Sequence, residues 1–191
     1  MNVLLVVDMT AITKENFTPQ TVPVALTASR AVLRILIVLN WVYAAAILTG
    51  LIGSFTAERI VMTAIGVPPS PETEPLIQGM RVMALLGLVS IPLHYVILRR
   101  LLDIVESVRA WDPFVFRNAS RLQTIAWALM GLQVLSIIIG GIARAVSTHA
   151  HPFRVNAGFS LNGWLAVLLM FVLARVFAEG ARMRDELEGT I

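Results

Sequence analysis

Residues 35–55 read ILIVLNWVYAAAILTGLIGSF, a stretch without a charged side chain. A helix needs about 20 apolar residues to cross a hydrocarbon layer roughly 30 Å thick. This stretch is apolar around the whole circumference of a helix, whereas a surface helix of a soluble domain carries a polar face. It therefore predicts a transmembrane helix.

Three shorter stretches further along the chain have the same character. Arg81 and Arg99 flank the first of them, and basic residues at both ends of an apolar run mark the edges of a membrane. The predicted spans are about 35–55, 82–98, 125–142 and 159–177. Four spans predict an all-α fold, an integral membrane four-helix bundle that forms a single membrane domain over residues 1–191.

The composition supports a membrane protein. The chain is 57% hydrophobic and 14% charged, whereas an ordinary soluble domain is about 45–50% apolar and about 25% charged. This excludes a soluble globular enzyme, and the absence of cysteine excludes disulfide scaffolds and thiol chemistry. The net charge is +3, but the basic residues are scattered and form no stripe, so direct binding of nucleic acid is not predicted.

The distribution of basic residues predicts the orientation. Eleven lie on one side of the spans and four on the other, which by the positive-inside rule places both termini in the cytoplasm. The eleven are Lys14, Arg30, Arg34, Arg99, Arg100, Arg109, Arg117, Arg121, Arg175, Arg182 and Arg184. Residues 1–29 lack the basic region and cleavage site of a signal peptide, so we expect an interfacial or weakly structured leader.

Few polar side chains are predicted at membrane depth. No Asp or Glu lies within the four spans, which argues against proton- or sodium-coupled transport. His94 lies near the cytoplasmic edge of the second span and is an interfacial histidine, a proton-sensitive switch or a haem ligand, the first of these being favoured. Because no nucleophile, carboxylate pair or phosphate-binding loop accompanies it, we predict neither an enzyme nor a cofactor.

The loop between the third and fourth spans contains His149 and His151, which could supply two ligands to a metal ion. Two ligands do not make a metal site, so none is predicted. Small residues spaced four apart allow helices to approach closely. They are Ala46, Gly50 and Ser54 on the first span and Ser136 and Gly140 on the third. Whether they meet within one chain or in a homo-oligomer is left open by the spacing.

Two segments on the cytoplasmic side carry most of the remaining information. The second span continues as an amphipathic helix to Arg109, and Pro113 follows before the third span, which Asn118 is expected to cap. The fourth span continues as a helix for about three turns into a tail over residues 178–191. Within this helix we expect ion pairs between Arg175 and Glu179 and between Arg182 and Glu186.

The tail carries acidic residues at its C-terminal end, where the helix dipole disfavours negative charge. These residues either keep the tail soluble or complete an acidic and apolar surface that docks a basic partner. The predicted docking residues are Phe177, Glu179, Arg182, Asp185, Glu186, Leu187 and Glu188.

The same two segments resemble the signatures of a bacterial family, the domain of unknown function 2975. The resemblance lies in the loop motif Pro113, Phe114, Asn118 and Arg121 and in the tail from residue 173 to 191. It implies a four-span protein of the bacterial inner membrane, often encoded beside a small helix-turn-helix regulator of the Cro/CI type.

We therefore expect a membrane anchor or sensor, in contact with the lipid bilayer, that docks such a basic DNA-binding regulator. A small immunity, detoxification or carrier protein that binds a hydrophobic compound within the helix bundle is the alternative.

Overall fold

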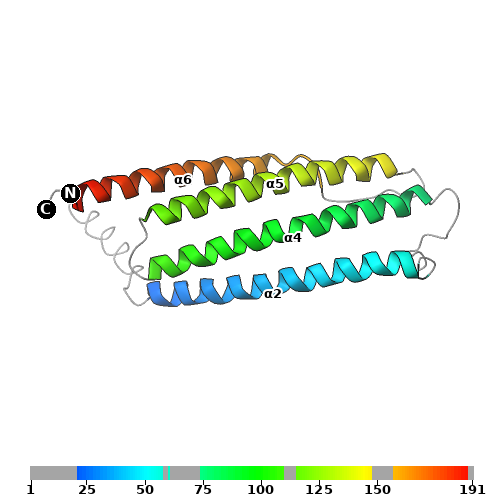
Figure 1. The fold of residues 1–191 in the computed structure, drawn as a ribbon, viewed down its shortest axis with the longest axis horizontal. Helices are drawn as coiled ribbons and strands as arrows, with labels where there is room; N and C mark the ends of the chain where they lie inside the picture. The colour runs from blue at the N-terminus through cyan, green and yellow to red at the C-terminus, as the bar shows by residue number, and fades with distance from the viewer. Residues whose placement is uncertain (1–20, 58–59, 61–73, 110–114, 148–156, 189–191) are drawn as a thin grey trace, which may run out of the picture.

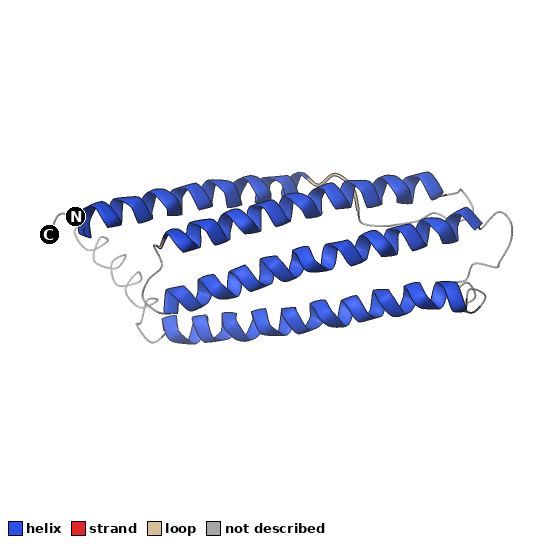
Figure 2. Ribbon diagram, in the orientation of Figure 1, coloured by secondary structure: helices blue, strands red, loops and turns tan. Residues whose placement is uncertain are grey.

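The computed structural model describes residues 21–57, 60, 74–109, 115–147 and 157–188, and these form helices with short connections. The four helices are α2 (Thr21–Thr56), α4 (Glu74–Arg109), α5 (Phe116–Val146) and α6 (Leu161–Glu188). Figure 2 shows that helix accounts for nearly all of the described chain, and each helix is long and apolar enough to cross a membrane. The predicted all-α fold with four spans is confirmed.

The helices lie in a row in the order of the chain (Figure 1). α2 contacts α4, α4 contacts α5 and α5 contacts α6, and among the described helices α2 contacts neither α5 nor α6. Many large apolar side chains consequently face outward, including Val38, Trp41 and Leu165. Exposure of such a surface to water would be unfavourable in free energy, whereas hydrocarbon solvates it well. The described helices are thus suited to contact with a lipid bilayer.

Side chains fix the register between neighbouring helices. Asn40 Nδ2 of α2 donates a hydrogen bond to the carbonyl oxygen of Ile91 in α4, at 3.3 Å. The rings of Trp41 and Tyr95 meet edge to face with centroids 6.0 Å apart. These contacts join the first two spans near the middle of α2.

The chain enters α6 through an extended segment that packs against the third predicted span, in α5. Ser136, inside the third predicted span, donates to the carbonyl of Gly158 at 3.2 Å and accepts from its N–H at 3.1 Å. Backbone without helical hydrogen bonds is tolerated in a membrane only where the protein satisfies its polar groups. The Ser136 hydroxyl meets this requirement for both polar groups of Gly158.

Gly140 is the residue that lets this segment approach α5. A Cβ on Gly140 would overlap the backbone of Ala157, and Gly158 itself has a φ of 141°, a conformation that side chains disfavour. The small-residue spacing of the third span is therefore used within the chain. On the first span Gly50 faces open space and Ala46 is exposed, whereas the Ser54 hydroxyl accepts a hydrogen bond from α4.

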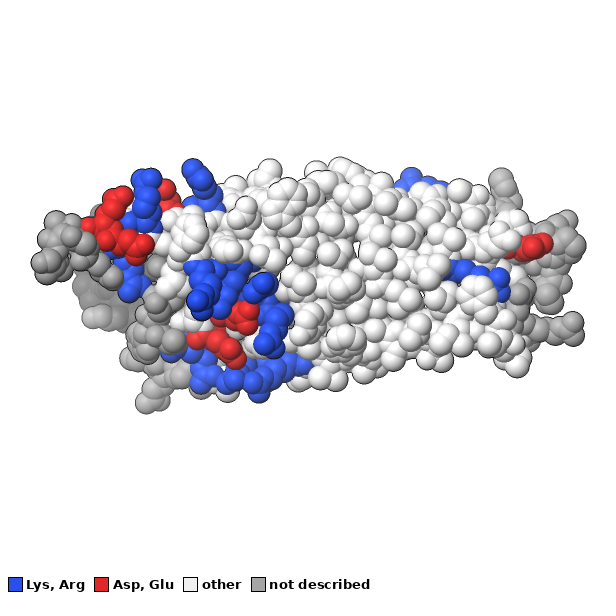
Figure 3. Space-filling model, viewed as in Figure 1, with Lys and Arg blue, Asp and Glu red and all other residues white. Residues whose placement is uncertain are grey.

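Charged side chains gather at the two ends of the molecule and leave an apolar zone between them (Figure 3). We call the end where α2 and α5 begin and α4 and α6 end the charged end, because most of the described acidic and basic residues lie there. The other end, which contains Arg81 and Arg144, is called the opposite end. The start of α2 and the end of α6 lie at the charged end (Figure 1).

Candidate functional site at the charged end

Asp103 of α4 is the centre of an ion-pair cluster at the charged end. Its carboxylate lies 3.9 Å from Arg99 Nε, 3.6 Å from Arg100 Nη1 and 4.0 Å from Arg121 Nε of α5. Arg121 Nη1 also donates to the backbone carbonyl of Asp103 at 3.0 Å. Two of the three arginines come from the same helix as Asp103, so Arg121 is the member that joins α5 to α4.

Asn118 completes this cluster from the first turn of α5. Its side chain is fully buried, its Nδ2 donates to Ser107 Oγ at 2.7 Å, and its Oδ1 accepts from Arg121 Nη1 at 2.8 Å. The Asn118 and Arg121 positions of the loop motif therefore act together as a clamp between α4 and α5. Pro113 and Phe114 of the same motif lie outside the described residues.

The predicted capping role of Asn118 is wrong. Val115 occupies the N-cap position of α5, no side chain caps the helix there, and the Asn118 N–H bonds to the Val115 carbonyl at 2.8 Å. The helix begins at Phe116, earlier than predicted, so Asn118 already lies inside the first turn. From there its side chain reaches Ser107 on the neighbouring helix rather than its own backbone.

α2 joins the charged end through a more exposed contact. Arg30 Nη2 lies 3.2 Å from Glu106 Oε1, with the two side chains 35% and 46% exposed. Arg121 and Asp103 are only 16% and 21% exposed, so their interaction is less screened by solvent. The α4–α5 clamp is thus the firmer part of the charged end.

The tail continues α6 as a helix to Glu188, as predicted. Arg182 pairs with Glu186 at 3.5 Å, as expected, and also with Glu179 at 2.7 Å. The expected pair between Arg175 and Glu179 is wrong, because Glu179 pairs with Arg182 and Arg175 makes no ion pair within the described part of the chain. Glu179 therefore pairs with the arginine one turn after it in the helix rather than with the arginine one turn before it.

The predicted docking residues do not share one face of α6. At about 100° per residue, Glu179, Arg182 and Glu186 lie together, and Phe177 lies on nearly the opposite side, where it is half-buried. Asp185 and Glu186 are exposed. Leu187 and Glu188 belong to the helix, but their side chains are outside the described set. The exposed part of the predicted surface is therefore acidic rather than apolar.

His94 lies on α4 with an exposed side chain, and its Nδ1 is 2.8 Å from the carbonyl oxygen of Ser90 in the same helix. This contact is local and links His94 to no other helix. His149 and His151 lie outside the described residues, and within the described ranges no three His, Asp or Glu side chains are grouped as metal ligands would be.

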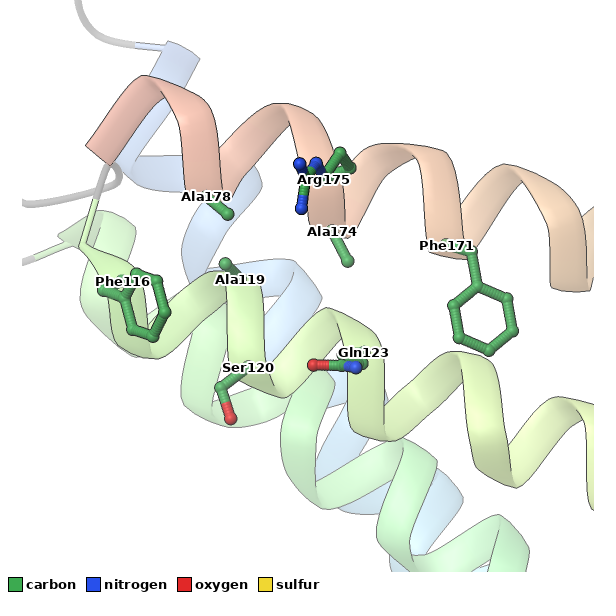
Figure 4. Close-up of a pocket in the computed structure, with 8 residues that line it drawn as sticks. All are labelled: Phe116, Ala119, Ser120, Gln123, Phe171, Ala174, Arg175 and Ala178. Atoms are coloured by element: carbon green, nitrogen blue, oxygen red, sulfur yellow. The ribbon is translucent and has the colours of Figure 1, made fainter. Parts of the chain in front are cut away.

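A groove between the start of α5 and the second half of α6 was missed by sequence reasoning. Its volume is about 420 Å³. Figure 4 shows the Ala119 and Ala178 methyl groups facing each other across the gap, with Ala174 and the Phe171 ring pointing toward α5. The lining residues are Phe116, Ala119, Ser120, Gln123, Phe171, Ala174, Arg175 and Ala178. In the sequence, the one feature that pointed to this groove was Arg175, a cation inside an apolar run.

A family model described as a protein of unknown function, DUF2975, matches residues 11–191, nearly the whole chain. The chain belongs to the DUF2975 family. This confirms the resemblance drawn from the loop motif and the tail, and four helices suited to crossing a membrane fit a multi-pass DUF2975 protein. No curated protein and no solved structure matches the chain.

Proposed function

We propose that this DUF2975 protein is a membrane anchor or sensor whose charged end docks a small, basic DNA-binding regulator in the cytoplasm. The observation that carries the proposal is the extension of α6 beyond the apolar zone as a helix with exposed acidic side chains, among them Glu179, Asp185 and Glu186. The role is one of binding, and no catalytic step is assigned to any residue.

The orientation in the proposal follows from the arginines. Of the described ones, Arg81 and Arg144 lie at the opposite end and the others at the charged end. Basic residues are retained on the cytoplasmic side during insertion, and this supports an orientation with the charged end in the cytoplasm of a bacterial inner-membrane protein. A tail on that side has access to soluble regulators.

The chemistry of the tail favours a basic partner. Arg182 is shared between Glu179 and Glu186, so the three side chains carry a net negative charge. Asp185 makes no ion pair with any described residue, and with the exposed Arg184 counted, the tail over residues 178–191 has four acidic residues against two basic ones. Acidic side chains attract a DNA-binding domain through the basic surface that contacts phosphates, so docking would compete with DNA binding.

The test compares capture of soluble proteins by crosslinking and purification in mild detergent. The bait is the full chain, the variant Glu179→Gln/Asp185→Asn/Glu186→Gln, or the control Arg175→Gln on the same helix. We expect the full chain and the control to retain a small helix-turn-helix protein that the triple variant loses. Equal retention by the triple variant, or no such protein with any bait, would contradict regulator docking.

The alternative function, binding of an apolar compound between helices as in an immunity, detoxification or carrier protein, gains support from the groove between α5 and α6. The groove is lined mainly by alanine and phenylalanine, and Arg175 favours an anionic amphiphile over a cationic compound. Growth protection by the full chain that survives the triple tail substitution but is lost with Arg175→Gln would favour this function.

A further inference from the structure

The groove between α5 and α6 lies across the boundary between the apolar zone and the charged end. Phe171 contacts Trp127 of α5 edge to face, with centroids 5.4 Å apart, inside the predicted spans of both helices. Arg175 and Gln123 each lie four residues, about 6 Å along the helix, toward the charged end. The two antiparallel helices therefore change from apolar to polar at the same level.

This arrangement gives the groove two chemically different zones. The Phe171 and Ala174 side chains make the inner zone apolar, and the exposed ring of Trp127 continues that surface toward the middle of the membrane. Arg175 and Gln123 bring a guanidinium and an amide to the outer zone. A ligand that fits both zones has an apolar chain and a polar anionic head.

Arg175 is suited to an anionic head. It makes no ion pair with any described residue, although Asp103 and Glu106 at the same end of the molecule are paired with other arginines. A guanidinium forms paired, charge-assisted hydrogen bonds with phosphate oxygens, and basic pockets between helices at the membrane edge bind lipid head groups. The bilayer supplies such a ligand at this depth.

We propose that the groove between α5 and α6 is a binding site for an anionic phospholipid of the surrounding leaflet, with the phosphate held at Arg175 and an acyl chain lying along Phe171 and Trp127. The site is separate from the acidic face of the tail. It does not depend on the docking of a regulator, and a failure of either proposal leaves the other to be judged by its own experiment.

The test measures lipid binding to the purified full chain by native mass spectrometry in detergent. The probes are phosphatidylglycerol and phosphatidylcholine with identical acyl chains. Arg175→Gln removes the cation, Arg175→Lys keeps it, and Arg182→Gln is the control on the same helix, outside the groove. Circular dichroism checks that the variants keep the helical content of the full chain.

We expect one phosphatidylglycerol to bind in preference to phosphatidylcholine. Arg175→Gln should weaken this binding by about tenfold, the usual scale for a charge-assisted hydrogen bond. Arg175→Lys should retain most of the binding and Arg182→Gln all of it. Equal binding of the two lipids, or equal loss in Arg175→Gln and Arg182→Gln, would overturn the proposal. Displacement of phosphatidylglycerol by millimolar inorganic phosphate would show that the site binds free phosphate, and it would overturn the assignment of a lipid as the ligand.

A second measurement needs no change at Arg175. With Trp41, Trp111 and Trp164 replaced by phenylalanine, Trp127 reports on the groove through its fluorescence. Brominated phosphatidylglycerol should quench it at a lower mole fraction than brominated phosphatidylcholine does. Identical quenching curves would contradict a preference for the anionic lipid.

Discussion

The two ends of the molecule use arginine differently. At the charged end, Arg121 and Arg30 meet the carboxylates of Asp103 and Glu106 across helix boundaries. At the opposite end, Arg81 Nε donates to Ser54 Oγ at 3.3 Å, its Nη2 donates to the Ser54 carbonyl, and its Cζ lies 4.3 Å from the centre of the Phe55 ring.

Arg144, also at the opposite end, donates through Nε to the carbonyl of Gly140 at 3.2 Å. These contacts are with backbone carbonyls, a serine hydroxyl and an aromatic ring, and at Gly140 the backbones of α5 and of the segment before α6 pack closely. The comparison indicates that side-chain charge holds the charged end and steric fit holds the opposite end. Substitution of a closely packed glycine and substitution of an interhelical arginine should therefore lower the free energy of unfolding by different amounts.

The largest effect is expected where two backbones meet. Gly140→Val places a side chain against the Ala157 backbone and should lower the free energy of unfolding by about 3 kcal/mol, since backbone cannot move aside as a side chain can. Gly141→Val is the matched control, because the space around Gly141 is open. Unfolding by SDS in mixed micelles measures both, and equal losses would refute the steric account.

The clamp at the charged end comes next. Arg121→Met removes hydrogen bonds to the Asp103 carbonyl and to Asn118 and should cost about 2 kcal/mol, because buried polar groups lose their partner. Arg117→Met, exposed on the same helix, should cost little. The same SDS titration measures the free energy of unfolding of both variants. Equal losses would show that the clamp does not contribute to stability.

A smaller loss is expected for Arg81→Met. It removes the hydrogen bonds to Ser54 and the contact with the Phe55 ring, and the cation–π part should account for about 1 kcal/mol. Combining it with Phe55→Leu in a double-mutant cycle isolates that part from the hydrogen bonds. Additive losses in the cycle would mean that the ring contributes nothing to holding Arg81.

The smallest effect belongs to the exposed pair of Arg30 and Glu106. Arg30→Gln and Glu106→Gln should show a coupling energy below about 1 kcal/mol, since solvent screens half-exposed charges. The coupling should shrink further when unfolding is measured in high salt. A coupling energy larger than the loss measured for Arg121→Met would reverse the ranking of the two contacts at the charged end.

The sequence predicted the four spans because the length of an apolar run is a local property. The row of helices could not be predicted in this way, since amphipathic patterns do not say which helices are neighbours. The extended segment before α6 also escaped prediction: its position depends on how Gly140 and Ser136 meet Gly158, which lie on different elements.

The candidate site was predicted in part. The sequence pointed to Asn118 and Arg121, but local capping rules gave Asn118 the wrong partner, because its hydrogen bond goes to Ser107 on another helix. The groove was missed since its lining comes from two helices about 50 residues apart, and only their pairing brings Gln123 near Arg175.

The row of helices has a consequence for how the chain assembles. Among the described helices, every contact joins elements that follow one another along the chain, so the contact order is low. Low contact order favours fast folding, and chains are synthesised from the N-terminus. Each helix can therefore dock on its predecessor as soon as it enters the membrane, and no pairing of α2 with α6 has to wait for synthesis to finish.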